Sequence, residues 1–264
     1  MAEITASLVK ALRETTGLSM MDCKKALIEA EGDMGRASDL LRKKGLTTAE
    51  KKSGRTTGEG LVAIEVDPSG ASAAMVLVRC ETDFTARNDE FRAMVQEVAR
   101  LAAQAPAGPV EASPAMTAKI QACLAKTGEN MGFAKGVKIA APLVGTYLHL
   151  DSKKGVIVGI EGEVSPEILT GLCHHIVFHD PMGITVDDIP ADFVEHEKRI
   201  AVEQAMESGK PKEIAEKMVA GKIRKALAKN ALLEQPFVAD ETKTVKEVLG
   251  AAKVVAFARF AVGA

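Results

Sequence analysis

A pattern of two short apolar segments followed by a helix-like segment occurs twice in the sequence, and this repeat most constrains the fold. In each copy a turn separates the two apolar segments, as Asp67-Pro68-Ser69-Gly70 does in the first. Apolar runs joined by a short turn are typical of β-hairpins. The copies comprise residues 61–66, 73–78 and 91–98, and residues 145–150, 156–160 and a helix that begins near Ser165. We therefore predict an α+β fold with two related subdomains, each a small antiparallel sheet with helices on one side.

Three short helical patterns precede the first copy. Ser19 and Asp33 are placed to cap the second and third of them. They predict a compact module similar to the ubiquitin-associated three-helix fold, followed by a basic segment, residues 42–55, which we interpret as a solvated and partly helical linker. Met20 and Met21, beside the first turn of the second helix, could present a small apolar patch to a partner, although methionines at helical spacing more often lie in a core.

A helical hairpin is predicted near the C-terminal end. Residues 192–234 show helical apolar spacing on both sides of a turn at Ser208-Gly209-Lys210-Pro211. Its charged flanks favour a projecting arm over a hairpin packed flat on the core. Residues 253–262 then form a strand that completes the second sheet. The predicted domains are residues 1–54 (module and linker), 55–144 (first subdomain), 145–191 with 235–264 (second subdomain) and 192–234 (inserted hairpin).

The composition excludes several classes of protein. With a net charge of -2 over 264 residues, the chain lacks a global basic field, so nucleic acid is not expected as its main partner. The four cysteines are far apart and form no CxxC pair, which favours free thiols in a reducing compartment. No segment reaches the roughly 18 uninterrupted apolar residues of a membrane span. We therefore expect a cytoplasmic protein without a membrane partner.

The strongest candidate site lies between the second strand and the helix of the first copy. Thr82, Asp83 and Phe84 place one large aromatic among polar residues, in a chain whose aromatic content is only 3%. An apolar side chain on a polar turn is typical of a contact that enters a partner's pocket. The alternative is that Phe84 folds back onto its own sheet, and the residues alone leave both possibilities open. Asn88 or Asp89 could cap the helix that follows.

Two glycine-rich segments do not predict a nucleotide site. Residues 58–63 match the GxGxxA dinucleotide pattern, but a polar linker precedes the glycines and a strand follows them, which reverses the required order. Residues 128–136 lack the GK[ST] ending of a phosphate-binding loop, so their glycines are expected in turns and bulges. We predict no cofactor.

A histidine cluster gives the main alternative function. His175 and His179 are four residues apart and share a helix face, beside His174, so a metal site has to be considered. No acidic general base lies between them, which favours a packing role and no metal. A hydrolase or metal enzyme that uses this cluster or Cys80 is therefore the second hypothesis. It is disfavoured because no nucleophile, base and orienting group occur together at usable spacing. A three-helix adaptor on an unrelated core is a third possibility.

Four motifs, in order, resemble bacterial elongation factor Ts along essentially the whole chain. They are Thr16-Gly17 followed by Met20-Met21-Asp22-Cys23-Lys24-Lys25-Ala26-Leu27, then Glu81-Thr82-Asp83-Phe84-Thr85-Ala86-Arg87-Asn88, Ser208-Gly209-Lys210-Pro211-Lys212 and Gln235-Pro236-Phe237-Val238. The resemblance implies a non-catalytic guanine nucleotide exchange factor that binds elongation factor Tu, GDP-bound or nucleotide-free, and promotes GDP release during translation elongation. It implies no direct nucleotide binding; a homodimer is possible but not indicated.

The resemblance also implies which residues contact elongation factor Tu. The family's Thr-Asp-Phe motif is pushed into the GTPase domain beside its magnesium and phosphate-binding region, the N-terminal module contacts the same domain, and the second subdomain meets another domain. The corresponding residues here are Thr82, Asp83 and Phe84, then Met20 and Met21, and, as weaker candidates, His149 and His175.

Three departures limit this transfer. Thr85 stands where the family usually has valine, and Ala134-Lys135 where many members have an arginine pair. The sequence ends at Ala264, whereas some members continue into a C-terminal helix, so contacts of such a helix are not assumed.

Overall fold

The N-terminal module consists of three helices with their own core. The computed structural model describes residues 4–52, 54–207 and 212–263. The helices are α1 (Ala6–Thr16), α2 (Met20–Glu29) and α3 (Met34–Lys52). Leu12 and Leu27 are buried at their centre, and Ser19 caps α2 by accepting from the backbone N–H of Asp22. The helix α3 continues through most of the segment that we expected to be a partly helical linker, because lysine, alanine and glutamate favour helix.

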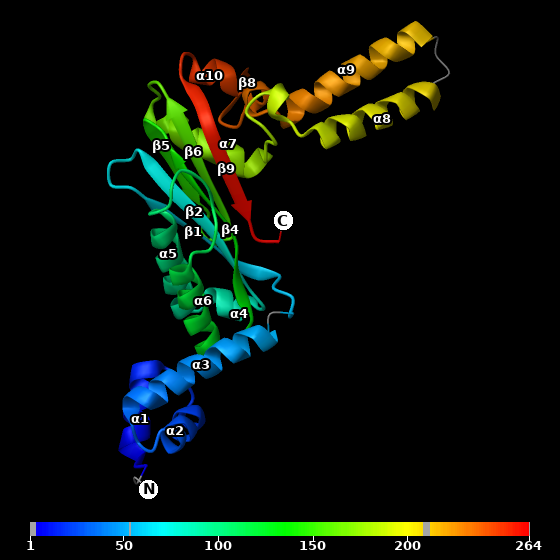
Figure 1. The fold of residues 1–264 in the computed structure, drawn as a ribbon. Helices are drawn as coiled ribbons and strands as arrows, with labels where there is room; N and C mark the ends of the chain where they lie inside the picture. Colours follow the sequence, from blue (N-terminus) through cyan, green and yellow to red (C-terminus); the bar gives the residue numbers. More distant parts are fainter. Residues whose placement is uncertain (1–3, 53, 208–211, 264) are drawn as a thin grey trace.

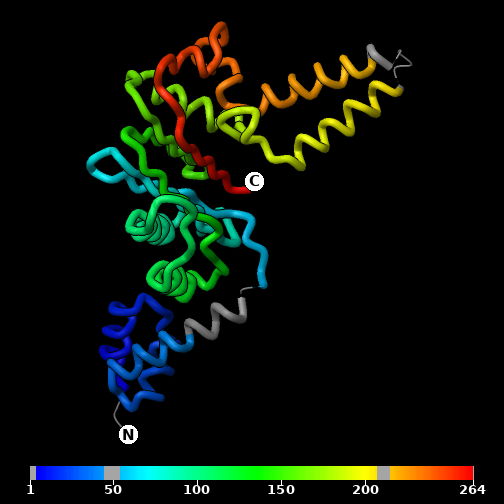
Figure 2. The backbone as a smooth tube through the Cα atoms, turned by 45° about the horizontal axis from the view of Figure 1, so that its top comes forward, coloured from blue at the N-terminus to red at the C-terminus, as the bar shows by residue number. Residues whose placement is uncertain are grey.

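A four-stranded antiparallel sheet forms the first core unit, in the order β1-β2-β4-β3 (Figure 1). Its strands are β1 (Glu59–Val66), β2 (Ser72–Cys80), β3 (Gly108–Val110) and β4 (Met131–Ala140), and its helices are α4 (Asp83–Arg87), α5 (Asp89–Ala102) and α6 (Pro114–Thr127). The helices α5 and α6 lie side by side against this sheet (Figure 2). The proline, glycine and alanine content of residues 104–113 predicts a loop, but β3 lies within this segment, and its pairing with β4 supplies the regularity that three residues lack alone.

A three-stranded antiparallel sheet forms the second core unit, in the order β5-β6-β9. Its strands are β5 (Leu143–Leu148), β6 (Lys154–Glu161) and β9 (Lys253–Ala261). The helices α7 (Pro166–His179) and α10 (Val245–Leu249) cover this sheet. The short elements of the same unit are η1 (Val186–Asp188), η2 (Leu232–Glu234), β7 (Pro236–Phe237) and β8 (Asp240–Thr244). The last strand completes this sheet, as predicted, and it does so by pairing with β6. The fold is α+β.

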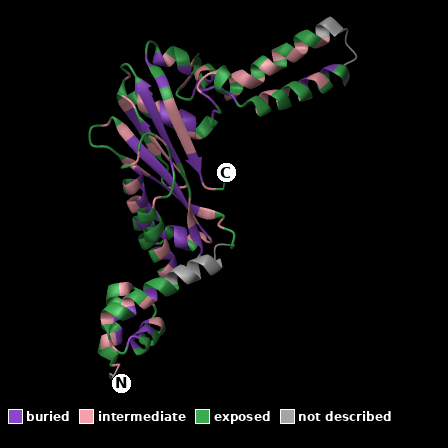
Figure 3. Ribbon diagram, in the orientation of Figure 1, coloured by how far each residue is buried: buried purple, intermediate pink, exposed green. Residues whose placement is uncertain are grey.

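The two sheets pack face to face, which the sequence did not reveal. Along β2, Met75 and Leu77 point to the second sheet, where they share a core with Ile157 of β6, while Val76 and Val78 face α5 and α6. Because β2 and β6 are buried on both faces, their apolar runs are nearly continuous (Figure 3). A side chain at Gly155 would come within 2.7 Å of Val62, so the sheets approach closely only because this residue is glycine. The core is therefore a four-layer sandwich of helices, sheet, sheet and helices.

The helices α8 (Ala191–Glu207) and α9 (Lys212–Asn230) run side by side and extend away from the second sheet (Figure 1). Ala201 and Ala205 are buried between them. The predicted turn Ser208-Gly209-Lys210-Pro211 lies outside the described residues. The predicted domain boundaries stay a prediction, although β5 begins at Leu143, two residues before the expected division between the subdomains. Within the described residues, no helix is both long and apolar enough to cross a bilayer.

Candidate functional site

The Thr82-Asp83-Phe84 segment forms a short helix and not the turn that we expected. Thr82 caps α4, since its hydroxyl accepts a hydrogen bond from the N–H of Thr85 at 3.3 Å. Asn88 has extended backbone angles (φ -68°, ψ 133°), ends α4, and caps α5 through its side chain, which accepts from the N–H of Glu90 at 2.8 Å. Two capped helices therefore meet at one residue, and α4 is held at both ends.

Phe84 points away from the molecule. Its exposed fraction is 80%, whereas Thr85 and Ala86, the next residues of α4, are buried against the core. Exposure of a large aromatic on a short, anchored helix contradicts the alternative that Phe84 folds back onto its own sheet. Asp83, beside it, forms an exposed ion pair with Arg87 at 3.1 Å, one turn along α4.

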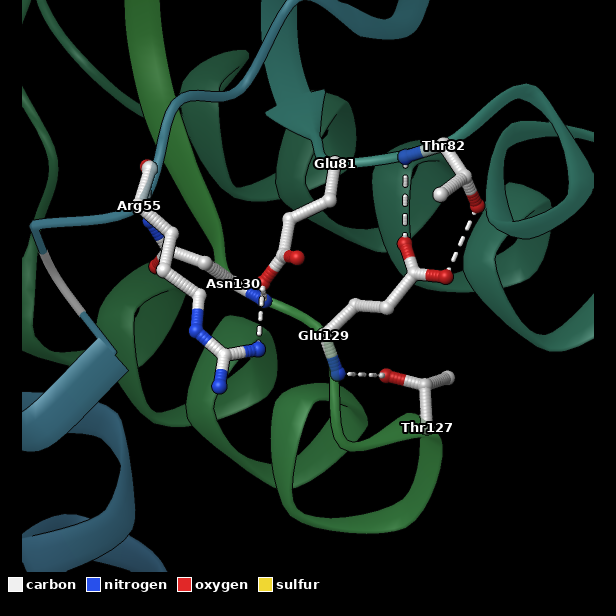
Figure 4. Close-up of polar contacts among 6 residues, drawn as sticks. All are labelled: Arg55, Glu81, Thr82, Thr127, Glu129 and Asn130. Atoms are coloured by element: carbon white, nitrogen blue, oxygen red, sulfur yellow. Dashed lines mark hydrogen bonds and ion pairs between the residues drawn. The ribbon is translucent and has the colours of Figure 1, made fainter.

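Glu129 braces the beginning of α4 (Figure 4). Its carboxylate accepts from the backbone N–H of Thr82 at 3.2 Å and from the Thr82 hydroxyl at 2.7 Å. The N–H of Glu129 in turn donates to the hydroxyl of Thr127, at the end of α6. Thr82 is therefore engaged within the protein, which assigns it a structural place in the site.

A second set of contacts joins this junction to the segment after α3. Glu81 accepts from the backbone N–H of Asn130 at 2.6 Å and pairs with Arg55 at 3.4 Å, and the Asn130 amide donates to the carbonyl oxygen of Arg55 at 2.8 Å (Figure 4). Arg55, Glu129 and Asn130 were not among the residues predicted from the sequence, because nothing in their spacing relates them to Thr82. The only local signal for these residues was that an acid and an amide, Glu129 and Asn130, directly follow Gly128 at the end of a helix.

Cys80, which directly precedes this junction, does not have the properties of a nucleophile. Burial, followed by the negative charges of Glu129 and Glu59, raises the pKa of its thiol to about 12. Its Sγ donates to the carbonyl oxygen of Thr82 at 3.3 Å. A thiol with so high a pKa is protonated at neutral pH and is a weak nucleophile.

His149 lies on the turn between β5 and β6, at the same end of the sandwich as α4. This turn is fastened to the first sheet, because the N–H of Val62 donates to the carbonyl oxygen of Ser152 at 2.7 Å and Lys153 pairs with Glu59 at 2.7 Å. The pKa of Lys153 is raised, chiefly by its hydrogen bond to Glu59, and Asp83 of α4 contributes to this shift. Because α4 also lies against β1, the turn and α4 are neighbours.

His149 is exposed, and its Nδ1 is hydrogen-bonded to the Tyr147 hydroxyl at 2.8 Å. Leu150, beside it, is 98% exposed. Leu150 was not among the residues predicted from the sequence, although it carries the signal that singled out Phe84, an apolar residue next to a polar turn.

His175 is buried, which corrects its place among the contact candidates. Its exposed fraction is 0%, and both ring nitrogens are engaged: Nε2 with Gln235 Oε1 at 2.8 Å, and Nδ1 as acceptor from the N–H of Val238 at 3.2 Å. Because Nδ1 accepts, Nε2 carries the proton and donates to Gln235. Burial lowers the pKa of His175, and nearby His179 adds to this, against the opposing hydrogen bond with Gln235. It fastens α7 to the segment before β8 and cannot reach a partner.

The remaining candidates lie apart from α4. Met20 and Met21 are exposed by 42% and 62% on the first turn of α2, so they are not core residues. His175 and His179 stack with ring centroids 4.4 Å apart, but both nitrogens of His175 are occupied. Among the described residues, no group of three or more His, Cys, Asp or Glu side chains is placed to hold a metal ion.

The chain has close relatives among known proteins. The sequence model of the family Elongation factor TS matches residues 81–264. The Elongation factor Ts of Alkalilimnicola ehrlichii is 43% identical, over 98% of this chain and 92% of that protein. Those of Actinobacillus succinogenes and Sodalis glossinidius are 44% and 41% identical over 100% of this chain and 92% and 93% of theirs. Coverage of nearly the whole chain at this identity shows that it belongs to the elongation factor Ts family of translation elongation factors.

Proposed function

We propose that this protein is a guanine nucleotide exchange factor that binds elongation factor Tu and accelerates release of its GDP. The observation that carries the proposal is Phe84, a large aromatic that is 80% exposed on a helix anchored at both ends. A surface aromatic held in place loses little conformational freedom when a partner buries it, and such residues dominate the binding energy of interfaces. The family membership supports the identity of the partner and a cytoplasmic place of action.

The proposed mechanism needs no covalent chemistry. A GTPase holds GDP through Mg²⁺ and backbone N–H groups around the phosphates, so displacement of those elements weakens nucleotide binding. Phe84 would enter the GTPase domain beside this region, with Asp83 at the rim. By thermodynamic linkage, the factor weakens GDP binding by the same ratio as GDP weakens binding of the factor.

Two other exposed surfaces complete the proposed interface. The turn that carries His149 and Leu150 and the helix α4 both lie against β1, so one partner could contact both. Met20 and Met21 offer adaptable apolar contacts on the module. Thr82 supports the site from within, and His175 is left out because it is buried.

The enzyme alternative loses its candidate groups. The raised pKa of Cys80 keeps the thiol protonated, and His175 uses both ring nitrogens inside the protein. These findings favour a protein that acts through binding.

The test follows release of a fluorescent GDP analogue from elongation factor Tu with catalytic amounts of the protein. We expect the wild type to accelerate release of the GDP analogue. Phe84→Ala should reduce this acceleration at least about tenfold, since an anchor residue contributes about 2 kcal/mol or more. Its circular dichroism spectrum should be unchanged. No acceleration by the wild type would refute the proposal.

Asp83 provides a ranking within the site. Its carboxylate already pairs with exposed Arg87, and exposed ion pairs contribute little. We expect Asp83→Ala to slow release less than Phe84→Ala does. An equal or larger loss would show that the charge, and not the aromatic ring, dominates.

A further inference from the structure

We propose that Glu129 is a positioning residue, which holds Phe84 in the orientation needed for insertion and does so without contacting the partner. This inference rests on the proposed function for its effect on exchange, but its structural part can be tested on the protein alone. Glu129 lies just before β4, far from Phe84 in sequence, and both carboxylate oxygens bind Thr82, the residue at which α4 begins.

The helix α4 depends on outside support. It has only five residues, and an isolated helix of that length is not stable in water, because nucleation costs more than a single turn returns. Support at its far end comes from Asn88, and support from below comes from buried Thr85 and Ala86. At its near end, only Thr82 separates α4 from the bend that follows β2, so the position of Thr82 sets the direction of the helix.

Glu129 fixes Thr82 at two points. A single hydrogen bond would allow Thr82 to rotate about the axis of that bond. Two bonds, from the Thr82 N–H and hydroxyl to separate oxygens of the Glu129 carboxylate, prevent this rotation. The same hydroxyl accepts from the N–H of Thr85, so Glu129 also orients the oxygen that caps α4. Bonds to an ionised acceptor are stronger than neutral ones. The neighbouring contacts of Asn130 with Glu81 and Arg55 hold the backbone of Glu129 in place.

A held side chain should bind better than a loose one. Immobilising a flexible side chain at an interface costs roughly 0.5–1.5 kcal/mol. Loss of the clamp should therefore lower the rate of nucleotide release between about twofold and tenfold. Initial binding would use His149, Leu150, Met20 and Met21, which are untouched, and the cost is met only when Phe84 inserts. The concentration of factor at half-maximal rate should therefore change by less than about twofold.

The first experiment measures the mobility of position 84 directly. The chain contains no tryptophan, so the variant F84W carries a single reporter at a position that tolerates a larger ring because it is exposed. Time-resolved fluorescence anisotropy is recorded for F84W alone and combined with Glu129→Ala or Glu129→Gln. We expect the amplitude of the fast component of the anisotropy decay, which reports local motion of the tryptophan, to increase with Glu129→Ala. It should increase less with Glu129→Gln, which keeps one acceptor for Thr82.

Glu97→Ala and Glu97→Gln serve as matched controls. Glu97 lies on α5, where its carboxylate pairs with Arg100 and Lys119, so its loss also removes charge contacts but leaves Thr82 in place. We expect the F84W anisotropy decay to stay unchanged in these variants. A decay that is the same in F84W and F84W/Glu129→Ala would overturn the proposal, as would equal changes in the Glu97 controls. If Glu129→Ala does not fold, Glu129→Gln provides the comparison. Thr82→Val removes both the hydroxyl bond to Glu129 and the cap of α4, so it should loosen position 84 at least as much as Glu129→Gln does.

The second experiment places Glu129→Ala and Glu129→Gln in the native Phe84 background and measures GDP-analogue release. We expect a lower maximal rate with little change in half-saturation, and partial recovery in Glu129→Gln. If the wild type itself fails to accelerate release while the anisotropy result holds, the proposed function fails and the positioning role stands. A normal maximal rate in Glu129→Ala, with active wild type, refutes the effect on exchange.

Discussion

Phe84 and Phe91 are seven residues apart and have opposite environments. Phe84 is 80% exposed, and Phe91 is 0% exposed in the core between α5 and the first sheet. In one continuous helix two residues seven apart would lie on the same face, so both would be buried or both exposed. The difference therefore arises from the helix break between them.

The break is made by Asn88. Its extended backbone separates α4 from α5, and its side chain caps the second helix, so each helix takes its own direction. As a result α4 presents Thr85 and Ala86 to the core and leaves Phe84 outside, while α5 buries Phe91. Without the break at Asn88, Phe84 and Phe91 would lie on the same helix face and both would be buried. With it, Phe91 is buried and Phe84 is exposed.

The largest expected effect is on stability at Phe91. We expect Phe91→Ala to lower the free energy of unfolding by about 3–5 kcal/mol, because it removes a fully buried ring and leaves a cavity. Denaturant unfolding followed by circular dichroism measures this. Phe178, which is 75% exposed, gives the control: Phe178→Ala should change stability by less than about 0.5 kcal/mol. A loss below about 1 kcal/mol at Phe91 would break the comparison.

The burial of His175 predicts an effect of pH on stability. The pKa of His175 is lowered from 6.5 by burial, so the unfolded chain takes up a proton before the folded one as pH falls. Its contribution to stability is present above pH 6.5 and is lost as pH falls toward the lowered folded pKa. Wild-type stability should decline more steeply between about pH 7.5 and 5.5 than that of His175→Gln, with a slope difference of at most about 1.4 kcal/mol per pH unit. Parallel curves for the wild type and His175→Gln would contradict this.

Asn88 should have a smaller effect on stability. We expect Asn88→Ala to cost about 1 kcal/mol, because the N–H of Glu90 loses its acceptor. Alanine also favours a continuous helix, which would turn Phe84 toward the face of Phe91 and reduce nucleotide release. Thermal unfolding and the release assay measure the two effects. Asn88→Asp, which retains a capping oxygen, should preserve both, and an equal loss in Asn88→Asp and Asn88→Ala would show that capping is not the cause.

Phe84 itself should have the smallest effect on stability. Phe84→Ala removes a ring that is mostly in water, so the free energy of unfolding should change by less than about 0.5 kcal/mol. Measured beside Phe91→Ala in the same denaturation series, this result would separate the two rings by at least about 2.5 kcal/mol. A loss above about 1 kcal/mol would mean that Phe84 packs on the protein in solution.

Local signals accounted for most of the elements that the sequence predicted. Ser19 caps α2, Gly17 ends α1 in the left-handed conformation, and Asn88 caps α5, in each case because a short polar side chain or a glycine meets a helix end. Long-range contacts accounted for the errors. The short strand β3 exists through pairing with β4, and His175 is buried because α7 packs on β7, neither of which a local pattern contains.

By itself, the sequence determined the α+β repeat of hairpin and helix, the separate three-helix module and the projecting pair of helices, and it singled out Asp83 and Phe84 as candidate contact residues. Periodicity and capping act within a few residues, so they can be recognised along the chain. Only the tertiary structure decided that the two sheets face each other, that Phe84 stands outside the core, and that Glu129 clamps Thr82 from 47 positions away. These features depend on which distant segments come together. Side-chain packing across the sandwich determines which segments do so.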